Sequence, residues 1–135
     1  MSKTLPASPA TSSPPAKPLG NYSPVRVVPL GAVNLAFVSG LTASGHAPDD
    51  VAGQAEIIFA RMRELLVEVG GDLGHVVKIT TFLTDMGDYE RFNAVRNRVF
   101  AGTVPPPASS TVGTTALPRA GCRVEVEAVA VIPAA

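Results

Sequence analysis

The chain has 135 residues, of which 46% are hydrophobic, and its eleven basic and eleven acidic residues give no net charge at neutral pH. This length suits one domain with a modest core, and the absence of any basic run excludes the electrostatic surface of a tight nucleic-acid binder. The apolar runs are far shorter than the roughly 20 residues of a membrane-spanning helix, and the N-terminus lacks the charged-then-apolar order of a secretion signal. We therefore expect a soluble, cytoplasmic protein that binds neither nucleic acid nor membrane.

The N-terminal segment differs in composition from the rest of the chain. Residues 1–19 are mostly Pro, Ser, Ala and Thr, which cannot bury enough apolar surface to offset the entropy lost on ordering. We predict a disordered tail here and one domain over residues 20–135. Closely spaced prolines favour an extended conformation, so a docking arm is the alternative role for the tail.

The first half of the domain shows two short strands and a helix. Residues 25–28 and 35–39 are predicted strands, separated by a turn that contains proline and glycine. Apolar residues then recur at spacings of three and four, which predicts a helix over residues 50–69, with Asp49 or Asp50 placed to cap it. A glycine pair follows and can end the helix in the left-handed conformation.

The second half predicts a strand, a helix and two more strands. Residues 76–83 are rich in β-branched side chains, which predicts a strand. The segment that begins at Asp85 leads into a second predicted amphipathic helix, which reaches Val99. Residues 109–117 are β-prone and residues 124–132 alternate between apolar and other side chains. This order predicts an α+β sheet with both helices on one face. We expect another copy of the chain to cover the other face, giving a homo-oligomer.

The last predicted strand carries two carboxylates. Its period of two puts Glu125 and Glu127 on one face together with Val129 and Val131. If a neighbouring subunit covers this face, we expect at least one of the two glutamates to have a raised pKa and to be able to act as a general acid at neutral pH. The alternative is a solvent-facing strand that carries two solubilising acids.

Other polar residues offer weaker signals. Five hydroxyl side chains in the fourth predicted strand could bind a polar ligand or a water, although threonine is also a common strand residue: Ser109, Ser110, Thr111, Thr114 and Thr115. Asn93 borders the apolar face of the second helix and could present its amide to a ligand or to backbone. His46, His75 and Cys122 show no metal-ligand spacing, so we expect surface roles for the histidines, a structural role for the cysteine and no bound metal.

Short segments spread over residues 20–132 resemble the Rid (YjgF-type) family, and their order and spacing make the resemblance specific. The segments include Gly20-Asn21-Tyr22, Val38-Ser39-Gly40, Phe92-Asn93, Pro107-Ala108 and Glu125-Val126-Glu127-Ala128. The resemblance implies a chorismate-mutase-like α+β fold that assembles as a homotrimer. It also implies three clefts between adjacent subunits, each lined by residues from both.

The resemblance further implies an activity and a set of site residues. Well-known members of the family hydrolyse reactive enamines and imines to ketoacids and ammonia without a cofactor, so we expect a small-molecule substrate and no cofactor. Residue by residue, the resemblance assigns pocket positions to Tyr22, Ser39, Gly40 and Asn93. It assigns to Glu125 the role of organising the reacting water.

One position departs from the family pattern. Deaminating members carry an arginine that binds the substrate carboxylate, and Ser109 stands in its place in the segment Pro107-Ala108-Ser109-Ser110. A charge-assisted hydrogen bond contributes about 1.5–3 kcal/mol, so its loss weakens binding of an amino-acid-derived imine about ten- to over a hundredfold. We therefore expect a substrate other than 2-aminoacrylate, with Ser109 or Thr111 binding a neutral polar group.

Two alternatives to that reading stay open. Another cation, Arg96 or Arg119, could reach the cleft and bind the carboxylate in place of the missing arginine. The protein could instead be a non-catalytic trimer that binds small metabolites or partner proteins. Ribonuclease activity, which some relatives show, fits poorly with zero net charge and no basic patch.

Overall fold

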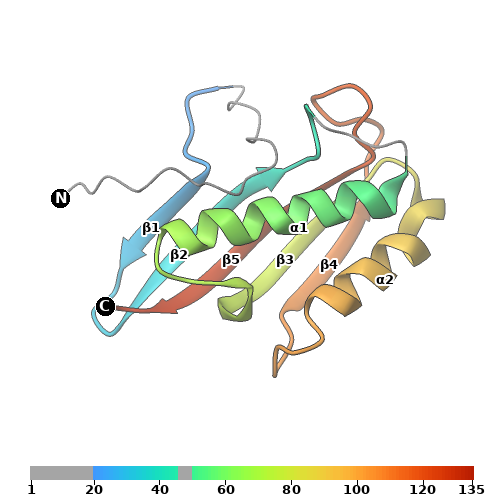
Figure 1. The fold of residues 1–135 in the computed structure, drawn as a ribbon. Helices are drawn as coiled ribbons and strands as arrows, with labels where there is room; N and C mark the ends of the chain where they lie inside the picture. Colours follow the sequence, from blue (N-terminus) through green and yellow to red (C-terminus); the bar gives the residue numbers. More distant parts are fainter. Residues whose placement is uncertain (1–19, 46–49) are drawn as a thin grey trace.

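The computed structural model describes residues 20–45 and 50–135, so the predicted tail, His46 and Asp49 lie outside the described residues (Figure 1). Seven main elements and two short 3-10 turns follow one another in the predicted order. They are β1 (Val25–Pro29), β2 (Val33–Leu41), α1 (Val51–Glu68), η1 (Leu73–His75), β3 (Val76–Leu83), η2 (Met86–Asp88), α2 (Tyr89–Val99), β4 (Ala108–Gly113) and β5 (Val124–Pro133).

The five strands form one mixed sheet in the order β1-β2-β5-β3-β4. All neighbouring pairs are antiparallel except β3 and β4, which run parallel because α2 connects them as a crossover. Both helices lie on the same side of the sheet, with α2 beside α1 (Figure 1). The predicted α+β sheet with two helices on one face is therefore confirmed.

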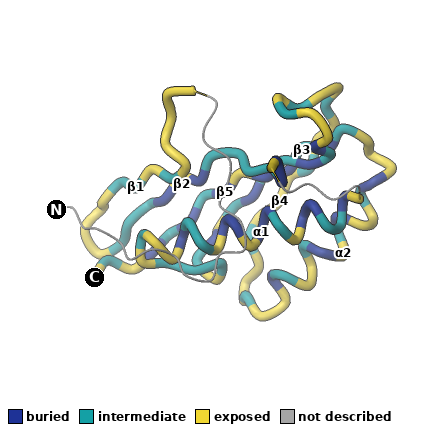
Figure 2. Tube along the Cα trace, turned by 45° about the horizontal axis from the view of Figure 1, so that its top comes forward, coloured by how far each residue is buried: buried dark blue, intermediate teal, exposed yellow. Residues whose placement is uncertain are grey.

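The core forms between α1 and the sheet face beneath it. On β5 every second residue from Val124 to Ile132 is buried, and Figure 2 shows this alternation along the strand. From α1 the fully buried Ile58, Met62 and Leu66 pack against this face, and the ring of Phe59 meets the rings of α2 and its C-cap. Removing these side chains from water is the main force that holds the helices on the sheet.

Local signals explain where α1 begins and ends. The Asp50 side chain accepts a hydrogen bond from the Gly53 backbone N–H at 3.2 Å and caps the first turn, as the sequence predicted. At the other end Gly70 adopts a φ of 92°, the left-handed conformation that stops a helix.

The sequence predicts a surface role for His75, but in the structure this residue is partly buried. Its Nδ1 accepts a hydrogen bond from the Asp72 N–H at 3.0 Å and closes the turn η1.

One strand is shorter than predicted. The β-prone stretch was expected to continue to residue 117, but β4 ends at Gly113. The reason is its partner: β4 is an edge strand that pairs only with β3, and β3 ends at Leu83, opposite Gly113. Residues beyond Gly113 have no ladder to join, so their intrinsic β-propensity does not produce a strand.

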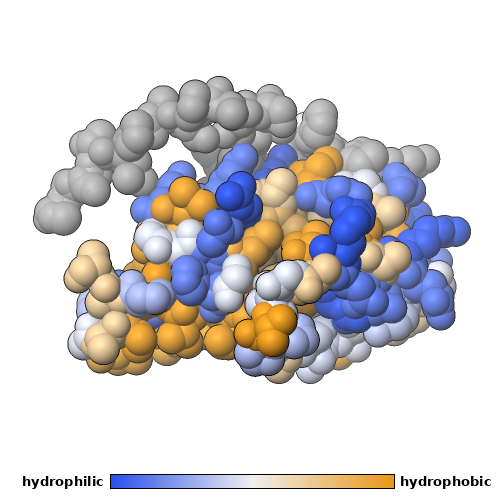
Figure 3. All heavy atoms as spheres, turned by 60° about the horizontal axis from the view of Figure 1, so that its bottom comes forward, coloured by the Kyte–Doolittle hydropathy of each residue, from blue (hydrophilic) through white to orange (hydrophobic). Residues whose placement is uncertain are grey.

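The second face of the sheet carries no helix within residues 20–45 and 50–135. Phe37 on β2 and Val112 on β4 are each 43% exposed there. Figure 3 shows the lower edge of the molecule as drawn in Figure 1, where hydrophobic and hydrophilic residues lie in patches side by side. Cover of the second sheet face by another copy of the chain stays a prediction.

No helix in the described ranges combines the length and apolar character needed to span a membrane.

Candidate functional site

Glu125 projects from β5 on the sheet face opposite the helices. The alternation along this strand leaves Glu125, Glu127, Val129 and Val131 on that face, as the sequence predicted. Glu125 is partly buried and Glu127 is exposed. Burial raises the pKa of the Glu125 carboxyl, and the nearby charge of Glu127 raises the pKa further. Its protonated form is therefore favoured relative to that of an ordinary surface glutamate.

Gly40 provides the space in which the Glu125 side chain lies. The pairing of β2 with β5 is irregular between Val38 and Leu41, so Gly40 sits in a bulge beside Glu125. A Cβ at position 40 would run into Oε2 of Glu125 and would lie 2.8 Å from its Cδ. Only glycine leaves room for the carboxylate in this position.

Ser39 fixes the segment that precedes β1. Its hydroxyl donates to the Ser23 carbonyl at 2.7 Å, and its backbone N–H donates to the Pro24 carbonyl at 2.9 Å. These bonds hold the neighbouring Tyr22, which is 50% exposed, at the rim of a groove of about 620 Å³ on the outer face of the sheet. We call this the sheet-face groove; its polar lining includes Tyr22, Ser39, Arg26, Lys78, Thr80 and Glu127.

A second group of polar residues gathers on the helix side, around Arg96 of α2. The Nη1 atom of Arg96 donates to the Ser109 hydroxyl at 3.2 Å, and its Nη2 atom donates to Oδ1 of Asn93. Arg96 and Ser109 line a pocket of about 710 Å³ between the end of α2 and the start of β4. We call this the α2–β4 pocket.

Within one chain the two groups do not meet. In the parallel pairing of β3 with β4, Ser109 lies opposite the buried Ile79 and so on the helix side, whereas Glu125 lies opposite Phe82 on the outer side. Two strand spacings, roughly 10 Å, also separate β5 from β4. Thr111 is on the helix side with Ser109, opposite the buried Thr81.

Arg119 is the second cation that the sequence analysis proposed for the cleft, and it does not lie on α2. It is partly buried in the loop that joins β4 to β5, where its carbonyl accepts from the Cys122 N–H at 3.4 Å. Cys122 is itself buried.

The two sheet faces divide the other predicted site residues into two sets. The outer-face set is Tyr22, Ser39, Gly40 and Glu125, and the helix-side set is Asn93, Arg96, Ser109 and Thr111.

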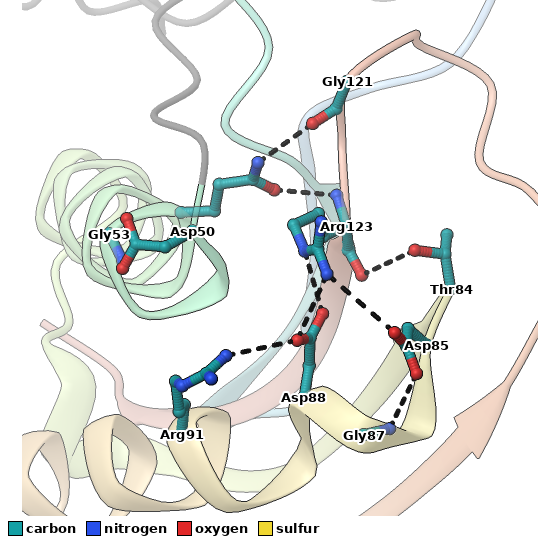
Figure 4. A network of polar contacts seen from close by, with 10 residues as sticks. Asp50, Gly53, Thr84, Asp85, Gly87, Asp88, Arg91, Gly121 and Arg123 are labelled. Atoms are coloured by element: carbon teal, nitrogen blue, oxygen red, sulfur yellow. Dashed lines mark hydrogen bonds and ion pairs between the residues drawn. The ribbon is translucent and has the colours of Figure 1, made fainter.

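A polar network that the sequence reasoning missed anchors the start of β5 (Figure 4). Asp88 is 3% exposed and accepts from Nε of Arg123 at 2.9 Å and from its Nη2 at 3.3 Å. Gln54 of α1 accepts from the Arg123 backbone N–H at 2.8 Å and donates to the Gly121 carbonyl at 2.9 Å. These bonds hold the chain two residues before Glu125. The available signal was Gln54, a polar residue on the apolar face of α1.

The sequence analysis also did not identify Arg26 and Lys78 as residues of the sheet-face groove. Both lie on the outer face and line the sheet-face groove, and the period of two in β1 and β3 was the available signal for their orientation. Across the described part of the chain, no three His, Cys, Asp or Glu side chains come together as a metal site.

Comparisons with known proteins place this geometry in context. The sequence model of the family described as "Endoribonuclease L-PSP" matches residues 11–132. Protein DfrA of Myxococcus xanthus is 41% identical over 120 residues, which cover 85% of this chain and 88% of DfrA. The mouse 2-iminobutanoate/2-iminopropanoate deaminase is 39% identical over 84 residues, 62% of this chain and 60% of the mouse protein.

Solved structures match over most of the chain. Escherichia coli TdcF with bound serine has a TM-score of 0.72 and 30% identity, over 84% of this chain and 90% of TdcF. A Mycobacterium tuberculosis member of the YjgF/YER057c/UK114 family has a TM-score of 0.68 and 33% identity, over 79% of this chain and 85% of that chain. The sheet with two helices described above is thus shared with these proteins.

Proposed function

Because the chain belongs to the endoribonuclease L-PSP family, which is also the YjgF family of reactive intermediate deaminases, we propose that it hydrolyses a reactive enamine or imine to a carbonyl compound and ammonia. The observation that carries this proposal is the Glu125 carboxyl, which lies in the space left by Gly40 and has a raised pKa. Relatives that match this chain are named as a 2-iminobutanoate/2-iminopropanoate deaminase and a reactive intermediate deaminase, and imine deaminases are hydrolases.

The reaction needs water and proton transfer. An enamine gains a proton at carbon and loses one from nitrogen, which makes it an imine. Water then adds across the C=N bond: its oxygen bonds to carbon, and one of its protons goes to nitrogen. In the resulting carbinolamine the C–N bond breaks, the electron pair leaves with nitrogen, the hydroxyl proton moves to that nitrogen, and ammonia departs from the new carbonyl group.

Glu125 is the group proposed to move these protons. A carboxyl whose pKa is raised by burial and by a like charge stays protonated at a higher pH than an ordinary carboxyl does. It can therefore donate its proton to the substrate nitrogen and afterwards accept a proton from water. Positioned proton transfer of this kind accelerates a reaction about 10²- to 10⁴-fold. Tyr22, Ser39 and Gly40 are proposed to line the substrate site on the same face.

We propose that the complete site forms between subunits of a homotrimer. Glu125 and Ser109 lie on opposite faces of one sheet, so residues of the outer-face set and the helix-side set can share one cleft only if two chains supply them. The outer sheet face has no helix over it in the described ranges, which leaves it open to another copy. A monomer peak in light scattering at micromolar protein would contradict this assembly.

The substrate is proposed to differ from 2-aminoacrylate, because Ser109 supplies a hydroxyl at the position where the family resemblance implies a guanidinium. The test of catalysis compares the wild type with Glu125→Gln on imines generated by an amino-acid oxidase, with ammonia release as the measurement. We expect about a hundredfold or greater loss in the variant. Glu68→Gln, which changes an exposed glutamate at the end of α1, is the matched control and should keep the wild-type rate.

A non-catalytic trimer that binds small metabolites is the second candidate, favoured by the neutral side chain of Ser109. Ser109→Arg separates the two candidates. Ammonia release from 2-aminoacrylate by this variant would indicate a working scaffold with altered specificity. Background release of ammonia by both the wild type and Ser109→Arg on every imine would reject catalysis and leave metabolite binding.

A further inference from the structure

Three arginines lie on α2, and Arg96 differs from the other two in its partners. Arg91 approaches the Asp88 carboxylate at 3.6 Å, and Arg98 pairs with Glu56 at 2.6 Å. Among residues 20–45 and 50–135, Arg96 has no carboxylate within ion-pair distance. Its contacts are the neutral oxygens of Ser109, Asn93 and Asn97. Its positive charge is therefore oriented but not neutralised.

The neutral contacts hold the guanidinium of Arg96 in a defined position. Nη1 is tied to Ser109 of β4 at 3.2 Å, and Nη2 is tied to Asn93 one turn earlier on α2. The guanidinium carbon lies 5.9 Å from the centre of the Phe92 ring, within cation–π range. An arginine side chain that is already ordered loses less conformational entropy when it binds an anion than a mobile one does.

The α2–β4 pocket presents this charge to a ligand. Arg96 is the only charged residue among the nine described residues that line it, and no acid competes for the guanidinium there. The walls are largely apolar, with contributions from Phe100, Val104, Pro106 and Pro107. A volume of about 710 Å³ falls in the range of small-molecule sites. One fixed cation in an apolar pocket fits an acid that carries an apolar side chain.

We propose that Arg96 binds the substrate carboxylate in the α2–β4 pocket, with Ser109 as the residue that positions its guanidinium. The planar fork of arginine matches the two oxygens of a carboxylate. The small Ser109 side chain leaves the adjoining volume to the ligand. This inference rests on the proposed function and names its substrate class: imines of 2-ketoacids with apolar side chains larger than that of 2-aminoacrylate.

The test measures binding rather than turnover. The probe is 4-methyl-2-oxopentanoate, a stable ketoacid, and its neutral control is the methyl ester, both titrated calorimetrically into the full-length protein. Arg96→Gln is expected to weaken binding of the acid about ten- to a hundredfold and to leave binding of the ester unchanged. Arg98→Gln removes the same charge from the same helix outside the pocket and should bind both probes as the wild type does.

Two further variants keep the test independent of folding and separate the role of Ser109. Arg96→Lys keeps the charge without the planar fork and should bind the acid with intermediate affinity. Ser109→Ala should weaken the acid by a few-fold only, because it loosens the guanidinium without removing it. Equal loss of acid and ester in Arg96→Gln, no loss of either, or displacement of the acid by equimolar inorganic phosphate would overturn the carboxylate assignment.

Failure of this inference is distinguishable from failure of the proposed function. If Arg96→Gln binds the ketoacid as the wild type does while the wild type releases ammonia, the carboxylate site is wrong and catalysis stands. If Arg96→Gln loses affinity for the ketoacid but Glu125→Gln and the wild type release ammonia at the same background rate, Arg96 binds carboxylates in a protein without the proposed activity.

Discussion

Replacing Gly40 with alanine tests whether β2 leaves space specifically for the Glu125 side chain. An added Cβ would run into Oε2 and would lie 2.8 Å from Cδ and 3.1 Å from Cγ of Glu125, and no other residue is among its three nearest neighbours. The φ angle of Gly40 is outside the left-handed region, so alanine is not strained by the backbone itself. The whole cost of Gly40→Ala should therefore come from Glu125.

The size of the effect follows from these contacts. Overpacking costs about 1–3 kcal/mol, and because Glu125 is only partly buried and can rotate toward solvent, we expect the lower part of this range. In a Glu125→Ala background the three clashing atoms are gone. There Gly40→Ala should increase the free energy of unfolding by about 0.4–1 kcal/mol, because alanine restricts the unfolded chain.

A double-mutant cycle measures this coupling. Urea unfolding of the wild type, both single variants and the double variant gives the four free energies of unfolding, and a coupling of about 1 kcal/mol or more is expected. The same Gly40→Ala variant should also lose ammonia release, because the carboxylate is displaced. An identical stability change from Gly40→Ala in both backgrounds would refute the assignment of Gly40 as the space for Glu125.

Three other predictions use the charges around β5. Burial and the charge of Glu127 raise the pKa of Glu125 above the ordinary value of 4.5, so the folded state holds this proton more tightly than the unfolded state does. Stability therefore falls as pH rises above 4.5 through the pKa of the folded state. Glu125→Gln should be more stable than the wild type at pH 7 and lose that advantage below pH 4.5 in pH-dependent urea melts. Glu127→Gln should lower the pKa of Glu125, measured by NMR titration of its carboxyl carbon, whereas an unchanged pKa would assign the whole shift to burial. Asp88→Asn should lower the free energy of unfolding by about 1–3 kcal/mol, because it weakens a buried acceptor of Arg123. The Asp85 side chain is 64% exposed and its Oδ2 lies 4.0 Å from Nη2 of Arg123, so Asp85→Asn should cost well under about 1 kcal/mol. Equal losses of unfolding free energy in the two variants would show that burial of Asp88 contributes nothing.

Features set by local periodicity were predictable from the sequence. The spacing of apolar residues located α1 to within one residue at each end, and the alternation in β5 placed Glu125 and Glu127 on one face. Both follow from the geometry of a single element, 3.6 residues per helical turn and 2 per strand repeat, which does not depend on the partners of that element. The family resemblance was confirmed by the comparisons over residues 11–132.

Features that depend on pairing and packing required the tertiary structure. The end of β4 was set by the end of β3, and the face on which Ser109 lies was set by its register opposite Ile79. Gly40 lies beside Glu125, and Arg96 lies beside Ser109, because separate elements meet there. The sequence by itself thus determined which elements form and how their own faces divide. Which faces meet was decided by the packing of the whole core, since that free energy is shared among residues far apart in the chain.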